Sequence, residues 1–140
     1  MNITELLTNL ATGINALMRV AASKFNLTGS QAFLLLSIPF DGIPMSGLAH
    51  RMGLDNSTLT RNIQKLEKLG LVKQLPDNYD RRVKRVILSS EGISLIELFD
   101  EHLENQNITI IEQIDLDTQE HLLTVLEKLS WALECVREKS

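Results

Sequence analysis

Apolar residues recur at the start of the chain with spacings that predict two helices. Over residues 3–24 they fall on one face of an amphipathic helix, formed by Ile3, Leu6, Leu7, Leu10, Ile14, Leu17 and Val20. A second helix is predicted over 31–38, where nearly every residue is apolar and the helix should be central to the core. Thr28 and Gln31 have the spacing of a capping box at its start, and Pro39 should end it.

A helix–turn–helix pattern follows. Residues 46–52 predict a short helix, and Gly53 predicts a tight turn after it. The next helix should start near Asp55, with Asp55 or Asn56 as its N-cap. Its inner stripe is expected to consist of Leu59, Ile63, Leu66 and Leu69. Gly70 then stands where a left-handed C-cap is favoured.

Two short strands are predicted after these helices, over residues 71–75 and 83–88. The connection between them, residues 76–81, is charged and contains the Pro, Asp and Asn residues typical of turns. We therefore expect a β-hairpin with a flexible tip.

Two long helices are predicted in the remaining chain. Ser89 or Ser90 should cap a helix that runs to about Ile114, and Asp117 should begin the last helix with Glu120 as its capping partner. The last helix has a long apolar stripe, formed by Leu122, Leu126, Leu129, Leu133 and Val136. The first and last helices cannot both bury such stripes against the short segment between them, so we expect a twofold homodimer.

The predicted fold class is mainly α with a small β-hairpin wing. A winged helix-turn-helix region, residues 27–90, lies between dimerisation helices in residues 1–25 and 91–140, all within a single domain of residues 1–140. A chain of 140 residues with 44% apolar residues is long enough to bury one core.

Charge is distributed unevenly and changes this picture. The net charge is −4, which alone does not favour nucleic acid. Residues 45–90 hold nine Lys and Arg against four acids, a balance of +5, whereas residues 91–140 hold three bases against twelve acids, a balance of −9. The asymmetry indicates either a basic working surface within an acidic scaffold or a chance clustering of solvated charges.

Several function classes find no support in the sequence. There is no nucleophile motif, glycine-rich phosphate loop or paired-carboxylate signature, so we expect no enzyme and no cofactor. His50, His102 and His121 lack metal-ligand spacing, and Cys135, the only cysteine, is expected to be structural. The longest charge-free stretch, residues 25–40, is too short to span a bilayer, and no secretory signal is evident. A cytoplasmic protein without membrane contact is predicted.

The second helix of the helix–turn–helix pattern has the features of a DNA-reading helix. Its apolar stripe can hold it to the domain, while short polar side chains let it approach the major groove closely. The residues expected on that outer face are Asn56, Ser57, Thr58, Thr60, Arg61 and Gln64. Arg61 could pair with a guanine edge. The alternative is the exposed polar face of an ordinary helix.

The predicted hairpin is strongly basic, with Arg81, Arg82, Lys84 and Arg85 within five residues. Such residues can contact phosphates or enter a narrow minor groove. Asp80 could accept a hydrogen bond from Arg82 and orient it. The alternative is a solvated edge hairpin whose charges prevent aggregation.

Three segments together resemble the MarR family of winged helix-turn-helix transcription regulators: LTGSQAFLLLSIP, MSGLAHRMGLDNSTLTRNIQKLEKLGLVKQ and DNYDRRVKRVILSSEG. The resemblance implies a homodimer with interlocking terminal helices that binds a pseudo-palindromic operator. It places Ser57, Thr58 and Arg61 where the recognition helix meets bases. It also places Arg82 where a wing arginine enters the minor groove, with Asp80 as its orienting partner. A small-molecule ligand of unspecified identity is common among members of this family.

The sequence therefore predicts a sequence-specific transcription regulator that binds double-stranded DNA and acts as a repressor. The candidate DNA-binding residues are Ser57, Thr58, Thr60, Arg61, Gln64, Asp80, Arg81, Arg82 and Lys84. The rival interpretation is a winged-helix protein-interaction module whose basic face meets an acidic partner. Apolar residues near Leu10, Leu17 and Phe33 are expected to belong to the core rather than to a ligand pocket.

Overall fold

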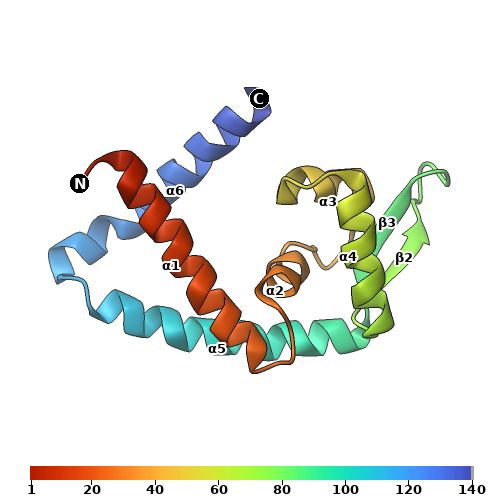
Figure 1. The fold of residues 1–140 in the computed structure, drawn as a ribbon, viewed down its shortest axis with the longest axis horizontal. Coiled ribbons are helices and arrows are strands. Elements are labelled where there is room, and N and C mark those ends of the chain that lie inside the picture. Colours follow the sequence, from red (N-terminus) through yellow and green to blue (C-terminus); the bar gives the residue numbers. More distant parts are fainter. Residues whose placement is uncertain (140) are drawn as a thin grey trace. The chain divides into compact units, whose positions relative to one another are not determined.

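The computed structural model describes residues 1–139 in two compact units, one from Met1 to His102 and one from Leu103 onward. The elements follow the chain as a helical protein with a small sheet (Figure 1): α1 (Ile3–Ser23), α2 (Gly29–Leu36), β1 (Ile43–Pro44), α3 (Met45–Met52), α4 (Asn56–Lys68), β2 (Val72–Pro76), β3 (Lys84–Leu88), α5 (Ser90–Glu112) and α6 (Leu116–Lys139). The predicted fold class, mainly α with a hairpin wing, is confirmed.

The first two helices form in the regions that the sequence predicts, but α1 buries different residues from those expected. In α2 the side chains of Thr28 and Gln31 complete the capping box. That helix spans Gly29–Leu36, so it starts two residues before the predicted range and ends ahead of Pro39, because the residue before a proline disfavours the helical conformation. Core residues of α1 are Met18, Ala21 and Ala22.

The predicted apolar stripe of α1 is exposed. Leu10 is 52% and Leu17 is 41% exposed, while Phe33 on α2 is only half-buried. The expectation that these positions form the core of the chain is therefore wrong for Leu10 and Leu17. Ile3, Ile14 and Val20 on the same stripe are exposed as well.

The helix–turn–helix pair forms at the predicted place. Gly53 ends α3 in the left-handed conformation with φ of 66°, which costs glycine little because it has no Cβ. Asp55 is the N-cap of α4, and Leu59, Ile63 and Leu66 are fully buried. Leu69, predicted to extend this stripe, is 54% exposed, because it lies at the C-cap, beyond the last residue of α4.

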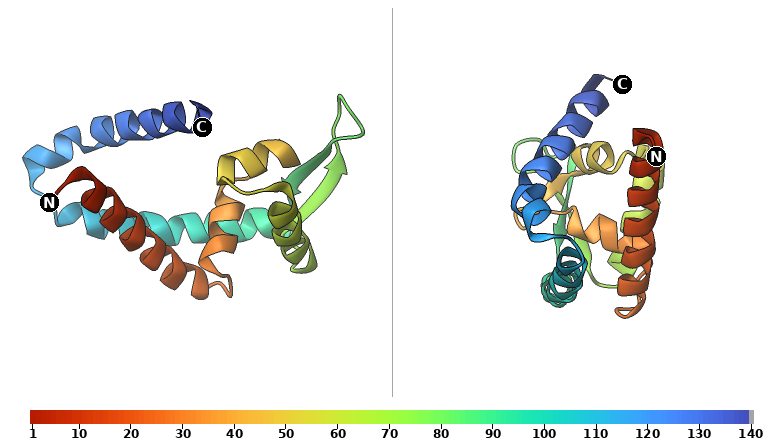
Figure 2. Two further views of the ribbon diagram at one scale, coloured as in Figure 1. Left: turned by 45° about the horizontal axis from the view of Figure 1, so that its top comes forward. Right: turned by 90° about the vertical axis from the view of Figure 1, so that its left-hand side faces the viewer.

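The sheet has one strand more than the sequence predicts. Its order is β1-β3-β2, with all pairs antiparallel. The additional strand, β1, is only two residues long, so no alternation of side chains could reveal it. Val72, Val86 and Leu88 bury one side of the sheet, and the β2–β3 hairpin projects beyond α3 and α4 (Figure 2).

Of the caps predicted for the last two helices, the one for α5 is confirmed and the one for α6 is wrong. The hydroxyl of Ser89 accepts the backbone N–H of Gly92 at the start of α5, as one of the two predicted caps. For α6 the N-cap is Asp115, which accepts the N–H of Thr118 at 3.0 Å, so the assignment of Asp117 with Glu120 is wrong. None of the helices within residues 1–139 is sufficiently long and apolar to cross a membrane.

Candidate nucleic-acid interface

The N-terminus of α4 is fixed by Asp55. Its carboxylate accepts the N–H of Thr58 at 2.7 Å and the hydroxyl of Ser57 at 2.9 Å. These hydrogen bonds, first the one from the backbone of Thr58, lower the pKa of Asp55 below its ordinary value. An ionised cap at the positive end of the helix dipole stabilises the first turn. The turn that presents Ser57 is therefore stabilised by its cap.

The outer face of α4 carries the side chains that the sequence selected. Ser57, Arg61 and Gln64 are exposed, and Thr58 and Thr60 are half-buried. The guanidinium of Arg61 donates to the hydroxyl of Thr58 at 3.4 Å. The hydroxyl of Thr60 instead donates to the carbonyl of Asn56 at 2.7 Å, which leaves its oxygen able only to accept from a ligand.

At the tip of the wing, Asp80 and Arg82 form the predicted pair. The guanidinium of Arg82 donates from Nε to Oδ1 at 3.1 Å and from Nη2 to Oδ2 at 3.3 Å. The backbone N–H of Arg82 also donates to Asp80, at 3.1 Å. Hydrogen bonding by the Arg82 side chain is the main cause that lowers the pKa of Asp80. The carboxylate therefore stays ionised and directs an arginine that remains accessible.

One basic residue of the hairpin has a different role from the one predicted. Arg85 was expected to contact phosphates with its neighbours, but its side chain is only 23% exposed and pairs with Asp77 at 3.1 Å. It also donates to the carbonyl of Asp41 at 3.1 Å. Arg85 and Lys84 alternate along β3, so their side chains lie on opposite faces of the sheet: Lys84 is on the face of Val86 and Leu88, and Arg85 is on the other face, against Asp77 and Asp41.

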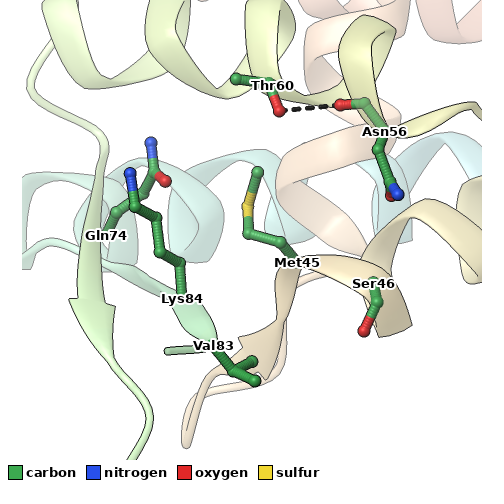
Figure 3. Close-up of a pocket in the computed structure, with 7 residues that line it drawn as sticks. All are labelled: Met45, Ser46, Asn56, Thr60, Gln74, Val83 and Lys84. Atoms are coloured by element: carbon green, nitrogen blue, oxygen red, sulfur yellow. Dashed lines mark hydrogen bonds between the residues drawn. The ribbon is translucent and has the colours of Figure 1, made fainter. Parts of the chain in front are cut away.

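The α4 helix and the wing enclose a shallow cavity of about 340 Å³ (Figure 3). Thr60 contributes from α4 and Lys84 from β3, so two of the predicted residues meet here. Asn56 on α4 and Val83 before β3 also line it. The remaining lining residues are Met45 and Ser46 at the start of α3 and Gln74 on β2. We did not predict these three residues from the sequence, because their position beside α4 depends on how α3 and the hairpin pack against it.

A second hollow of about 430 Å³ lies between α4 and the wing tip. Gln64 lines it together with Arg81, Arg82 and Lys84, and Glu67 is the acid that faces these bases. Gln74 donates a hydrogen bond to Glu67 and joins β2 to α4. The structure thus brings Gln64 and three basic wing residues to one surface, continuous with the exposed face of α4.

Within residues 1–139, no three His, Cys, Asp or Glu side chains gather to hold a metal ion. Cys135 on α6 is half-buried and forms no disulfide. What the surface offers is a set of hydroxyl, amide and guanidinium groups, which are the groups that contact phosphates and base edges.

Comparisons with known proteins agree with this geometry. Residues 27–84 match the model that describes the MarR family. Over 89 residues the chain is 32% identical to the HTH-type transcriptional regulator PecS of Dickeya dadantii, in an alignment covering 60% of this chain and 54% of PecS. The chain thus spans about half the length of the curated relatives it matches.

Solved structures extend the likeness to the fold as a whole. Wild-type MarR from E. coli in its apo form has a TM-score of 0.80 and 22% identity, covering 92% of this chain and 97% of its own. MepR from S. aureus, in a complex with DNA, has a TM-score of 0.76 and 20% identity, covering 95% and 99%. Identities this low show the fold alone. Taken with the family match and PecS, they support the resemblance found in the sequence: residues 27–84 match the MarR family, and the fold is similar to that of solved MarR-type regulators.

Proposed function

We propose that the protein is a transcription regulator that binds a pseudo-palindromic DNA operator as a homodimer and represses by blocking polymerase. The observation that carries the proposal is the surface shared by α4 and the wing. There the exposed Arg61 lies on the helix capped by Asp55, and Arg82 is oriented by Asp80 at the hairpin tip. PecS, the relative with the higher identity, is named a transcriptional regulator, and an enzyme is not expected.

The two arginines suit different grooves of the duplex. A helix with short polar side chains at its start fits the major groove, where Arg61 can donate to both acceptors of a guanine. Arg82 extends from a narrow hairpin, which suits the minor groove, where negative potential attracts arginine. Arg81 and Lys84 flank it and are exposed, so we assign them to phosphates. Ser57, Thr58, Thr60 and Gln64 would contact base edges or phosphates from α4.

The homodimer is supported by apolar surface that the single chain leaves uncovered. On α1 the exposed stripe contains Leu6, Leu10, Ile14 and Val20, and on α6 the exposed apolar residues include Leu123, Leu126, Trp131 and Val136. Contiguous apolar surface of this kind marks an interaction site. A second copy of the chain is the occupant that also yields two recognition helices for two half-sites.

Two finer parts of this proposal concern cellular context. A small-molecule ligand that changes DNA affinity remains a prediction from the family resemblance, as does a cytoplasmic location. Neither is needed for the DNA-binding step itself.

Selection of bound duplexes from a random DNA pool, at stated salt, tests the proposal directly. A specific reader should enrich a sequence with twofold symmetry and half-site centres about 34–36 Å apart, or a multiple of that distance. Failure to enrich any sequence, with no loss of duplex binding in Arg61→Ala or Arg82→Ala, would leave the protein-interaction module as the better account.

A further inference from the structure

Asp77 organises the base of the wing tip through three hydrogen bonds. One carboxylate oxygen accepts Nη1 of Arg85 at 3.1 Å, and the other accepts the backbone N–H of Tyr79 at 3.0 Å and of Asp80 at 3.1 Å. Only 11% of the Asp77 side chain is exposed. Arg85, followed by the two amides, lowers the pKa of this carboxyl group. The residue is therefore bound on both oxygens, unlike an ordinary surface aspartate.

Arg85 connects this tip to a distant segment of the chain. Its Nη2 donates to the carbonyl of Asp41, 44 residues earlier, at 3.1 Å. The turn that contains Asp41 can approach β3 because Gly42 has φ of 84° and no side chain, whereas a Cβ there would lie 2.6 Å from Ile87. Three segments thus meet at one guanidinium: the turn before β1, the strand β3 and the wing tip.

The oriented arginine depends on this connection. Arg82 is held by Asp80, but both residues lie on the same tip, so their pairing alone does not place them relative to α4. The backbone N–H of Asp80 is bound by Asp77, and Asp77 is bound by Arg85. Backbone hydrogen bonds from Asp77 to Val83 at 2.8 Å and from Val83 to Asp80 at 2.9 Å close the tip. The side chains of Asp77 and Arg85 add a connection from the tip to the turn before β1.

We propose that Asp77 and Arg85 are positioning residues that brace the wing tip, so that Arg82 is held at the height and direction needed to enter the minor groove while α4 occupies the major groove. The inference rests on the proposed DNA-binding function. A tip ordered before binding loses less conformational entropy on the duplex than a mobile one, which favours affinity and selectivity. Neither residue needs to touch DNA for this effect.

A direct phosphate contact by Arg85 does not account for the same observations. The guanidinium is largely buried, and two of its nitrogens already donate within the chain. An arginine used for phosphates would keep its donors toward solvent, as exposed Arg81 does.

Two conservative variants distinguish the positioning role of Asp77 and Arg85 from a direct effect of their charges on DNA binding. Arg85→Lys keeps the positive charge but lacks the planar fork that reaches Asp77 and Asp41 together. Asp77→Asn removes one negative charge from the wing, which by electrostatics alone should tighten DNA binding. If the brace operates, both variants should instead lose about three- to tenfold in operator affinity, with the base preference set by α4 retained. Asp41→Asn is the matched control, because it removes the same negative charge but leaves the backbone carbonyl that Arg85 uses, and it should bind slightly more tightly.

A double-mutant cycle and hydrogen exchange show whether the effect passes through the wing tip. In an Arg82→Ala background, Arg85→Lys should cost almost nothing further, because the residue it positions is gone. An additive loss would indicate general destabilisation and overturn the inference. Without DNA, the amides of Tyr79 and Asp80 should exchange faster in Asp77→Asn, while amides in α4 keep their protection.

The failure of this inference is distinguishable from the failure of the proposed function. If the parent protein binds its operator and loses affinity with Arg61→Ala, but Arg85→Lys and Asp77→Asn match the parent, the brace is rejected and the DNA-binding function stands. If the parent selects no duplex, the function is rejected and the brace with it. Circular dichroism of each variant confirms that it is folded.

Discussion

Arg82 donates two side-chain hydrogen bonds to Asp80, yet 91% of its own side chain remains exposed. An arginine that is both oriented and accessible is prepared for a ligand rather than for stability, since an exposed ion pair contributes little to folding. The pair is therefore the most specific sign of function on the wing, and it leads to the first prediction.

Arg82→Ala should weaken binding to most duplex sequences and reduce the slope of log affinity against log salt by about one unit per site, because one phosphate-region charge is lost. Asp80→Ala retains the arginine and should leave that slope unreduced while lowering the preference for narrow minor grooves. Fluorescence anisotropy across a salt series on specific and random duplexes measures both. Equal salt slopes for parent and Arg82→Ala would contradict this assignment.

Arg61→Ala should behave differently from the wing variants. Loss of a bidentate contact with a guanine edge costs about 1–3 kcal/mol per half-site and relaxes the preference at one position. The stability of the domain should be unaffected, since Arg61 is exposed. Binding isotherms on the selected operator and on single-base variants of it test the prediction, and a uniform loss on every sequence would argue against base recognition.

The exposed stripe of α1 predicts the assembly state. Light scattering at micromolar concentration should give the mass of a dimer, because Leu10 and Ile14 are 52% and 55% exposed in the single chain. Ile14→Glu should shift the mass toward a monomer and weaken operator binding, because a charge would be buried in the interface. Thr8→Glu, elsewhere on the same helix, serves as the control. A monomeric mass for the parent would reject the dimer.

Acid should destabilise the fold partly through Asp77. Its folded-state pKa lies below the ordinary value of 3.8 because Arg85 and two backbone amides stabilise the ionised form. The native state then binds fewer protons than the unfolded state, so this contribution is complete above that ordinary value and disappears as pH falls through the folded pKa. Urea unfolding from pH 6 downward should show the gap between parent and Asp77→Asn closing with acidity. A constant gap would show that the carboxylate is not the source.

Gly92 should be intolerant of any side chain. A Cβ at this position would lie 2.1 Å from the carbonyl oxygen of Leu71, so the start of α5 would have to move from the sheet. Gly92→Ala should lower the free energy of unfolding by about 1–3 kcal/mol. In Gly29→Ala the Cβ would meet only ordinary contacts of 3.5 Å or more, and the change should be neutral or slightly stabilising. Denaturant unfolding of both variants provides the comparison.

Local sequence determined much of this architecture. The helix caps are short-range signals, because each acts on backbone within four positions of itself. Thr28 and Gln31 cap the start of α2, Asp55 caps the start of α4, and the left-handed Gly53 ends α3. They place helix ends correctly because capping is a local interaction. The outer face of α4 and the Asp80–Arg82 pair were predictable for the same reason.

Other features required the tertiary structure. The strand β1 exists because β3 pairs with it, and two residues alone carry no recognisable pattern. The stripe of α1 has the same periodicity whether it faces a core or a second copy, so the sequence could not assign Leu10 and Leu17. The sequence does not distinguish Arg85 from its basic neighbours, because its contacts with Asp77 and Asp41 form only in the folded chain. Interactions between neighbouring residues can be predicted from the sequence. The hydrogen bond from Arg85 to Asp41 joins residues 44 positions apart, so it forms only when the tertiary structure brings the two segments together.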